Sequence, residues 1–268
     1  MHDFHLAQGD RPILASMPHV GTEVPKFLLP RLTRAARAVP DTDWLLPELY
    51  DFLEHLGVSR LAAVHARQWV DLNRPPDDAP LYDGPTTGLV PHTLFDGRSA
   101  WQRGAAPDPS EVAIWLESGW RPYHRALGDE LARLRRAHGE VVLLDLHSIR
   151  SRVPRLFEGR LPDVNLGTND GASCDRSLTE ALVRSVAGRG YDHVVDGRFR
   201  GGYITRFYGR PGDGVHAVQL ELVQATYMDE DAPPAVSPER ARRVRPVLRA
   251  FVEAALRWIE ERTGSRGR

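Results

Sequence analysis

The stretch "EVVLLDLHSIR", residues 140–150, gives the clearest indication of the fold. Five of the six residues after its first glutamate are apolar, which predicts a short strand covered on both faces, as in the sheet of an α/β protein. Asp145, His147 and Ser148 follow at the point where the chain is expected to leave the sheet. A polar turn and a functional site explain these three residues equally well. The residues at the other predicted strand ends must decide between the two explanations.

Predicted strands and helices alternate on both sides of this stretch. Strands are expected at 12–17, in two short extended pieces within 60–72, at 141–146 and within 214–228; helices are expected at 41–57, 109–137, 177–190 and 238–263. This order predicts an α/β fold in which helices flank one central sheet that is mixed and mostly parallel. No repeat, low-complexity tract or shift in composition divides the chain, so we expect a single domain over residues 1–268.

Two segments without a periodic pattern are predicted to be loops. Residues 79–109 are rich in Gly, Pro, Thr and Asp, and residues 160–175 have a similar character. A loop as long as the first is often functional when it lies inside a compact domain. A lid over a site, an interface and a plain connection all fit its composition.

The composition is that of an ordinary water-soluble protein. Lys and Arg number 35 against 36 Asp and Glu, and this balance gives no support to binding of nucleic acid or of a membrane surface. No stretch approaches the ~20 apolar residues of a membrane span, and the first residues do not resemble a signal peptide. Cys174 is the only cysteine, which excludes an intrachain disulfide and favours a cytoplasmic location.

Polar side chains follow or interrupt the apolar run of each predicted strand. They are His19 and Glu23, then Asp71, Asn73 and Arg74, then Asp145, His147 and Ser148, and finally Gln219, Glu221 and Gln224. Ligands and catalytic groups of open α/β sheets gather where strands end. Single residues also have plainer explanations, since His19 suits a turn and Asn73 with Arg74 suits a solvated turn before a proline. A carboxylate such as Glu221 inside an apolar strand is harder to dismiss, because burying it unpaired is costly.

Two histidines, several carboxylates and an arginine suit metal-assisted hydrolysis. A catalytic zinc takes three His or carboxylate ligands and leaves a fourth position for water, whose pKa it lowers to about 7. A further carboxylate transfers the proton to the leaving amine, and an arginine holds a substrate carboxylate through two parallel hydrogen bonds. The chain contains no HExxH, GxSxG, P-loop or GxGxxG motif, so no short motif identifies the site by itself.

Six short motifs, taken in order, resemble those of the N-formylglutamate amidohydrolase family. They are PHVGTEVP (18–25), DTDW (41–44), WVDLNRPPDD (69–78), DLHS (145–148), GGYITRFYG (201–209) and HAVQLELVQATYMDE (216–230). The resemblance implies a fold like that of the zinc carboxypeptidases and aspartoacylases, a phosphorylase/hydrolase-like mixed sheet with zinc at the strand ends. It also implies hydrolysis of N-formyl-L-glutamate to formate and L-glutamate, a last step of histidine degradation.

The resemblance implies that His19, in P-H-x-G, and His147, in D-L-H-S, are metal ligands. The carboxylate ligand stays open, because carboxypeptidases use H-x-x-E whereas Glu23 falls one residue later than that spacing. The DTDW motif offers Asp41 and Asp43 instead, and we favour Asp43 at the head of its predicted helix. The expected metal is Zn²⁺, although these ligands also suit Co²⁺ or Mn²⁺.

Glu221, in Q-L-E-L, resembles the catalytic carboxylate of this superfamily and is expected to activate the attacking water. Asp145 is expected either to orient a ligand histidine from behind or to pair with an arginine in the core. Ser148 is not expected to be a nucleophile, because it lacks the G-x-S-x-G elbow.

Asn73 and Arg74 resemble the pair with which the superfamily grips a substrate carboxylate, and Arg74 is also a candidate for stabilising the oxyanion. The second carboxylate of glutamate needs another cation. Arg206 is the preferred candidate, because the glycines before it suit a loop that approaches a ligand closely. Arg150 and Arg152, which follow His147, are the reserve.

Two rival functions stay open. The first is a related zinc amidohydrolase that acts on N-formyl-aspartate or another N-acyl amino acid. The second is an inactive module that binds small dicarboxylates without a metal. In each case the partner is a small acidic molecule, and the sequence is silent about the oligomeric state.

Overall fold

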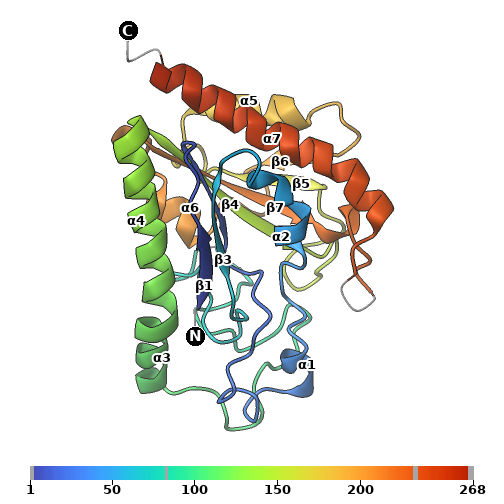
Figure 1. The fold of residues 1–268 in the computed structure, drawn as a ribbon. Coiled ribbons are helices and arrows are strands. Elements are labelled where there is room, and N and C mark those ends of the chain that lie inside the picture. Colours follow the sequence, from blue (N-terminus) through green and yellow to red (C-terminus); the bar gives the residue numbers. More distant parts are fainter. Residues whose placement is uncertain (1–2, 82–83, 232–234, 265–268) are drawn as a thin grey trace.

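The computed structural model describes residues 3–81, 84–231 and 235–264 and is built on one sheet, whose strands run in the order β1-β3-β2-β4-β7-β5-β6 (Figure 1). Their bounds are β1 Phe4–Ala7, β2 Ile13–Met17, β3 Ser59–Ala63, β4 Val141–Ile149, β5 Val164–Gly167, β6 His193–Val195 and β7 Val215–Val223. The pairings β2–β3, β2–β4, β4–β7 and β5–β6 are parallel, whereas β1–β3 and β5–β7 are antiparallel. The predicted mixed, mostly parallel sheet is confirmed.

Helices cover both faces of the sheet (Figure 1). Their bounds are α1 Arg34–Arg37, α2 Leu46–Leu49, α3 Pro109–Trp115, α4 Arg121–His138, α5 Arg176–Val186, α6 Tyr203–Tyr208 and α7 Pro238–Gly264. A π-helical turn, Leu116–Trp120, joins α3 to α4, so the predicted helix from 109 to 137 is nearly continuous. In the described part of the chain, no helix is both long enough and apolar enough to cross a bilayer.

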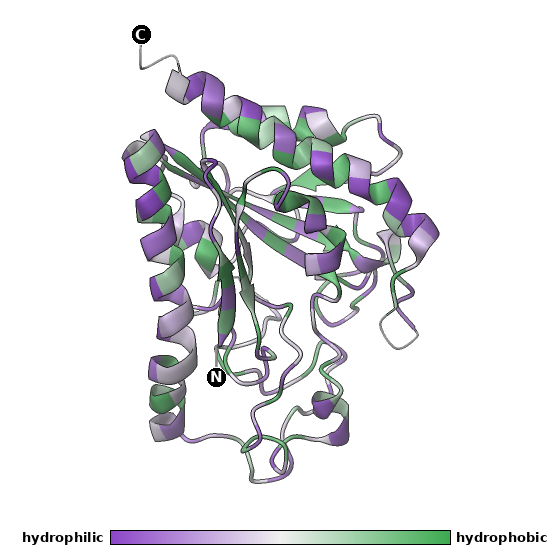
Figure 2. Cartoon of the chain, viewed as in Figure 1, coloured by the Kyte–Doolittle hydropathy of each residue, from purple (hydrophilic) through white to green (hydrophobic). Residues whose placement is uncertain are grey.

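Alternate residues of β4 pack into two separate cores. Val142, Leu144 and Leu146 face α5 and α7 and belong to the larger core. Val141 and Leu143 face the other way and pack with α4. Because successive side chains of a strand point to opposite faces, this doubly covered strand produces the unbroken apolar run in the sequence. Figure 2 shows hydrophobic residues on the strands between the helices and hydrophilic residues on the outer sides of α4 and α7.

β4 is longer than the predicted strand at 141–146. It continues to Ile149, so Asp145, His147 and Ser148 lie inside the strand rather than in a turn after it. The reason is that β7 pairs with β4 over its full length, from Val141 opposite Val215 to Ile149 opposite Val223. The backbone groups of the polar residues therefore keep their partners in the sheet.

Three other local predictions were wrong. The helix expected at 41–57 is reduced to α2 and a 3-10 turn, Asp51–Leu53, because Leu45 takes a left-handed conformation and Pro47 lies in the first turn. The loop expected at 160–175 contains β5, which is buried and pairs with β7. Of the two extended pieces expected within 60–72, only β3 is a strand.

Candidate active site

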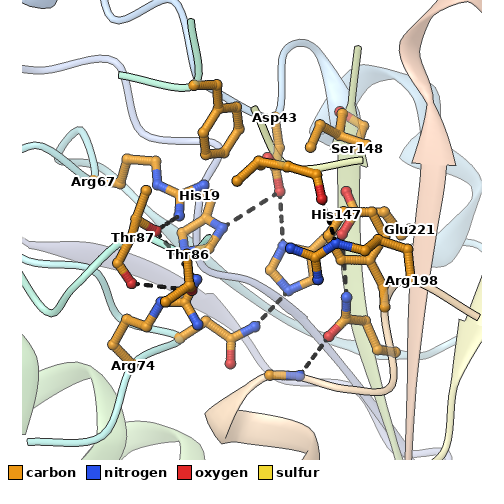
Figure 3. Close-up of a pocket in the computed structure, with 17 residues that line it drawn as sticks. His19, Asp43, Arg67, Arg74, Thr86, Thr87, His147, Ser148, Arg198 and Glu221 are labelled. Atoms are coloured by element: carbon orange, nitrogen blue, oxygen red, sulfur yellow. Dashed lines mark hydrogen bonds and ion pairs between the residues drawn. The ribbon is translucent and has the colours of Figure 1, made fainter. Parts of the chain in front are cut away.

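A pocket lined mainly by polar side chains lies on the face of the sheet that α4 covers (Figure 3). It begins where the apolar residues of β4 and β7 that pack against α4 end. On β4 the apolar residues that pack with α4 end at Leu143, and Asp145 and His147 follow on the same face. The register of the two strands places Gln219 opposite Asp145 and Glu221 opposite His147. Residues that are paired in register share a face of the sheet. The two strands thus deliver four polar side chains to one place.

His19 and Asp43 join this cluster from two loops. His19 follows β2, and its carbonyl accepts a hydrogen bond from the backbone N–H of Asp43 at 2.9 Å, which ties the two loops together. The rings of His19 and His147 lie 4.9 Å apart. Oδ2 of Asp43 lies 2.9 Å from Nδ1 of His147 and 3.8 Å from Nδ1 of His19. All three side chains are buried, and one donor atom from each lies within 4.8 Å of the others, as metal ligands require.

Each of the two histidines turns its second ring nitrogen towards a buried carboxylate. Nε2 of His19 lies 2.6 Å from Oδ1 of Asp71, and Nε2 of His147 lies 3.1 Å from Oδ1 of Asp145. Carboxylates in this position fix the tautomer and the orientation of ligand histidines.

The surroundings of the His147 ring suit a metal ligand. Oδ1 of Asp145 is buried and has no hydrogen-bond partner within the described chain. When Nδ1 of His147 binds a metal, the ring proton must reside on Nε2, directly beside that oxygen. Metal bound at Nδ1 would therefore leave a proton on Nε2 that faces this oxygen.

The two alternative carboxylates lie elsewhere. Asp41 accepts a hydrogen bond from the backbone N–H of Phe95, and the backbone of Glu23 pairs with that of His65, after β3, in an isolated β-bridge. Among the three acidic residues considered from the sequence, Asp43 is the one that meets both histidines.

The two histidines differ in protonation. Burial and the nearby Arg67 lower the pKa of His19, so its ring is a neutral and ready ligand. Burial also disfavours the charged form of His147, but Asp145 and Asp43 outweigh it and hold the pKa of His147 well above its usual value. A metal ion must therefore compete with a proton at His147, which makes metal affinity depend on pH.

Glu221 is a buried carboxylate beside the proposed ligands. Its Oε2 accepts a hydrogen bond from Nε2 of Gln219 at 3.1 Å, and Oε1 of Gln219 in turn accepts from the N–H of Gly202 at 2.7 Å. Burial raises the pKa of Glu221 to about 8. A carboxyl group with a pKa near neutrality is suited to accept and return a proton.

Three arginines line the same pocket, namely Arg67, Arg74 and Arg198. Arg67 is buried, forms an ion pair of 2.5 Å with Asp71 and stacks over Phe95. The carboxylate of Asp71 therefore serves both His19 and Arg67. Burial disfavours its charged form, but the charge of Arg67 and the hydrogen bond of His19 hold the pKa of Asp71 well below its usual value.

The other two arginines engage loops around the pocket. Nη2 of Arg74 donates to Oγ1 of Thr87 at 3.1 Å. Arg198 donates from Nε to the carbonyl of Leu156 at 2.7 Å and from Nη2 to the carbonyl of Pro85 at 3.0 Å. Thr86 and Thr87 also line the pocket, so the long loop at 79–109 contributes to its wall.

Asn73 supports the site from within. Its Oδ1 accepts from the N–H of Ile204 at 2.8 Å, and its Nδ2 lies 3.0 Å from Oδ2 of Asp145 and 2.9 Å from Nε2 of His147. A Cβ atom at Gly202 would lie within 2.6 Å of the Asn73 amide, so only glycine allows the start of α6 to pack here. The glycines before Arg206 were expected to let this loop approach a ligand closely. In the structure Gly202 instead approaches the side chain of Asn73.

The preferred second cation, Arg206, and the reserve candidates, Arg150 and Arg152, do not line the pocket. Arg206 donates from Nε to the carbonyl of Gly201 at 2.8 Å, and Arg150 forms an ion pair of 2.6 Å with Asp231. Neither belongs to the pocket wall, which uses Arg67 and Arg198 instead.

The sequence reasoning missed these two arginines for different reasons. Arg67 stands four residues before Asp71, and that spacing was a usable indication of an ion pair. Arg198 follows a short strand that the sequence did not reveal, so nothing local indicated its position.

Ser148 is held by other groups. The hydroxyl of Tyr227 donates to its Oγ at 2.8 Å, and Nε2 of Gln224 lies 3.4 Å away. No base among the described residues bonds to this hydroxyl, which agrees with its expected lack of a nucleophilic role.

A model of the N-formylglutamate amidohydrolase family matches residues 11–228. The chain belongs to this family. Two curated relatives of this amidohydrolase, both named N-formylglutamate deformylase, match almost the whole chain. The relative from Pseudomonas aeruginosa is 54% identical over 256 residues, which are 95% of this chain and 96% of that protein. The relative from Pseudomonas putida is 50% identical over 260 residues, which are 97% of each protein.

A solved structure shows the same fold as this amidohydrolase. The crystal structure of N-formylglutamate amidohydrolase from Ralstonia eutropha JMP134 has a TM-score of 0.81 and covers 97% of this chain and 98% of its own. The sequence identity of that pair is 24%, so the likeness concerns the fold alone.

Proposed function

We propose that this amidohydrolase hydrolyses N-formyl-L-glutamate to formate and L-glutamate with a bound divalent metal ion, and that residues 1–268 form one catalytic domain. One observation carries the proposal. In a chain of this family, His19, Asp43 and His147 meet in a pocket that also contains Glu221 and three arginines. We infer a cytoplasmic location from the single, buried cysteine.

His19, Asp43 and His147 would hold the metal, with Asp71 and Asp145 behind the two rings. When bound, a divalent ion polarises the formyl oxygen and lowers the pKa of a water molecule. Two imidazoles and one carboxylate with an open fourth position suit Zn²⁺ best, and Co²⁺ or Mn²⁺ are acceptable in the same ligand set.

Glu221 would act as the proton carrier of the reaction. The positive charge of a nearby ion favours the ionised form of a carboxyl group, so metal loading prepares Glu221 to take a proton from the attacking water. Its burial then favours holding that proton until the glutamate nitrogen accepts it as the C–N bond breaks. Gln219 keeps the carboxyl group in place through its amide.

The arginines would bind the acidic substrate. Arg67 lies deep in the pocket beside His19 through their shared partner Asp71, and Arg74 lies next to it with its Nε 3.9 Å from that carboxylate. Guanidinium groups bind carboxylates through paired hydrogen bonds. These two arginines are suited to hold the α-carboxylate of the substrate and to stabilise negative charge on the formyl oxygen.

The direct test is the release of formate from N-formyl-L-glutamate by protein that has been stripped of metal and reloaded with Zn²⁺, Co²⁺ or Mn²⁺. A panel of formyl, acetyl and succinyl groups on glutamate and aspartate separates this activity from that of a related amidohydrolase. Preference for N-formyl-aspartate would support the rival substrate. Stoichiometric binding of a dicarboxylate without metal uptake and without hydrolysis would support an inactive binding module.

A further inference from the structure

The three arginines of the pocket are held by different partners. Arg67 is almost fully buried, with 6% of its side chain exposed, and Arg74 is 15% exposed. Both contact Asp71, which also holds His19, so both lie close to the proposed metal ligands. Arg198 is bonded to two surface loops instead, through the carbonyl groups of Pro85 and Leu156.

The substrate has two carboxylates at unequal distances from the bond that breaks. The α-carboxylate is attached to the carbon that carries the reacting nitrogen, whereas the side-chain carboxylate is two methylene groups further away. The α-carboxylate must therefore remain beside the metal ligands, where Arg67 and Arg74 lie. The side-chain carboxylate extends away from them, towards a cation placed elsewhere on the pocket wall.

We propose that Arg198 binds the side-chain carboxylate and thereby selects glutamate derivatives; this inference rests on the proposed function. Figure 3 shows Arg198 on the His147 and Glu221 side of the pocket and Arg67 and Arg74 on the His19 side, so the cations flank the reacting centre. The two carbonyl acceptors orient the guanidinium of Arg198 at the pocket wall. A preorganised cation loses little conformational entropy when it binds an anion.

The position of Arg198 also relates selectivity to the loops of the pocket. Its bonds join the loop at 79–109, through Pro85, to the segment after β4, through Leu156. The ring centroid of Phe199 lies 5.3 Å from Cζ of Arg198, and Phe199 lines the same pocket. The apolar side chains of Phe199 and Leu156 are placed to contact the methylene groups of a glutamate side chain.

The test compares N-formyl-L-glutamate with N-formyl-L-glutamine, which keeps the α-carboxylate and has an uncharged side chain of the same shape, in the zinc-loaded enzyme. We expect Arg198→Gln to lower kcat/KM for the glutamate compound by on the order of 10- to 100-fold, mostly through KM, because a charge-assisted hydrogen-bonded pair is lost. The value for the glutamine compound should change little, so the selectivity ratio should collapse. Arg198→Lys, which keeps the charge but loses the fork, should give an intermediate ratio.

Arg200→Gln is the matched control. Arg200 lies on the same segment, is exposed and pairs with Asp170 at 3.3 Å, away from the pocket wall. This variant should keep the wild-type ratio. Thermal unfolding of each variant checks that it is folded. If Arg198→Gln does not fold, the result for Arg198→Lys decides the test.

Two outcomes would overturn the inference, and they are distinguishable. If the wild type is active and selective, and Arg198→Gln or Arg198→Lys lowers kcat/KM equally for both substrates, Arg198 only fastens the loops together. If the wild-type enzyme hydrolyses neither compound with any metal, the proposed function fails and the inference fails with it.

Discussion

At the scale of single residues, the site is defined by which atom of each side chain faces which neighbour. His19 and His147 present Nδ1 to Asp43 and Nε2 to a second carboxylate. This arrangement separates the residues that would bind a metal from those that hold the ligands in place. The two groups predict different consequences of substitution.

Glu221→Gln removes the proposed proton carrier and keeps the shape of the side chain. We expect kcat to fall by about 10²- to 10⁴-fold, the usual contribution of general acid–base catalysis. The metal content, measured by elemental analysis, should match that of the wild type, because Glu221 is not one of the proposed ligands. A variant that retains its metal and turns over at nearly the wild-type rate would exclude Glu221 from this role.

Asp145→Asn alters the support of His147 and leaves the ligands unchanged. The amide is a weaker acceptor for the Nε2 proton that metal binding requires, so metal affinity should fall about 10- to 100-fold. Competition for Zn²⁺ with a chelator of known affinity measures this directly. Asp170→Asn, at an exposed surface ion pair, is the control and should bind metal as the wild type does. Equal affinity of the Asp145 variant and the wild type would mean that Asp145 serves only the fold.

At the scale of elements, α4 is fastened to the chain that leads into the site. His124 on α4 stacks on Trp120, with ring centroids 3.7 Å apart, and its Nε2 donates to the carbonyl of Leu72 at 2.8 Å. Leu72 immediately precedes Asn73, whose amide contacts Asp145 and His147. The position of this long helix is therefore linked to the position of the proposed ligands.

Burial lowers the pKa of His124 to about 4, against an ordinary value of 6.5. The native state favours the neutral ring more than the unfolded state does. The contribution of His124 to the free energy of unfolding is therefore complete above pH 6.5 and is lost as the pH falls towards 4. The loss should reach about 2 to 3 kcal/mol by pH 4.5, and urea unfolding at pH 7 and pH 4.5 measures it.

His124→Gln is the informative comparison, because other groups also titrate in this range. The variant is expected to be less stable at pH 7 and to lose less stability between the two pH values than the wild type. An unchanged difference between pH 7 and pH 4.5 would show that His124 does not contribute to it.

At the scale of the whole molecule, the proposed metal site joins parts of the chain that are distant in sequence. His19 follows β2, Asp43 precedes α2, and His147 lies in β4. A ligand that binds only the folded state stabilises it by mass action, by about 4 kcal/mol at a free concentration 1,000 times its dissociation constant. Metal binding should therefore stabilise the whole domain.

Thermal unfolding of stripped protein, with and without Zn²⁺, tests this expectation. The transition should move upwards by several degrees on addition of Zn²⁺, and Asp43→Asn should lose most of that shift because a charged ligand is removed. Mg²⁺ at the same concentration is a control, since it prefers oxygen ligands. An equal shift with Mg²⁺ would contradict a site built from two imidazoles.

Much of the fold followed from local patterns in the sequence. The apolar run before Asp145 identified a doubly covered strand, and the helices at 109–137, 177–190 and 238–263 lie close to the observed α3–α4, α5 and α7. The short β5 and β6 escaped notice, because strands of four and three residues have too few side chains to show a period. The helix at 41–57 was overestimated, because the backbone of Leu45 is decided by its surroundings in the fold.

Local patterns in the chain were enough to predict the α/β class, the polar residues at the strand ends and a resemblance strong enough to suggest the family. The folded structure was needed to show that Asp43, rather than Asp41 or Glu23, meets His19 and His147. It also replaced Arg206 and Arg150 by Arg67 and Arg198 in the wall of the pocket. The physical reason is that strand and helix periods are local properties of the chain, whereas a site is made by contacts between distant residues, such as His19 and His147, which are 128 positions apart.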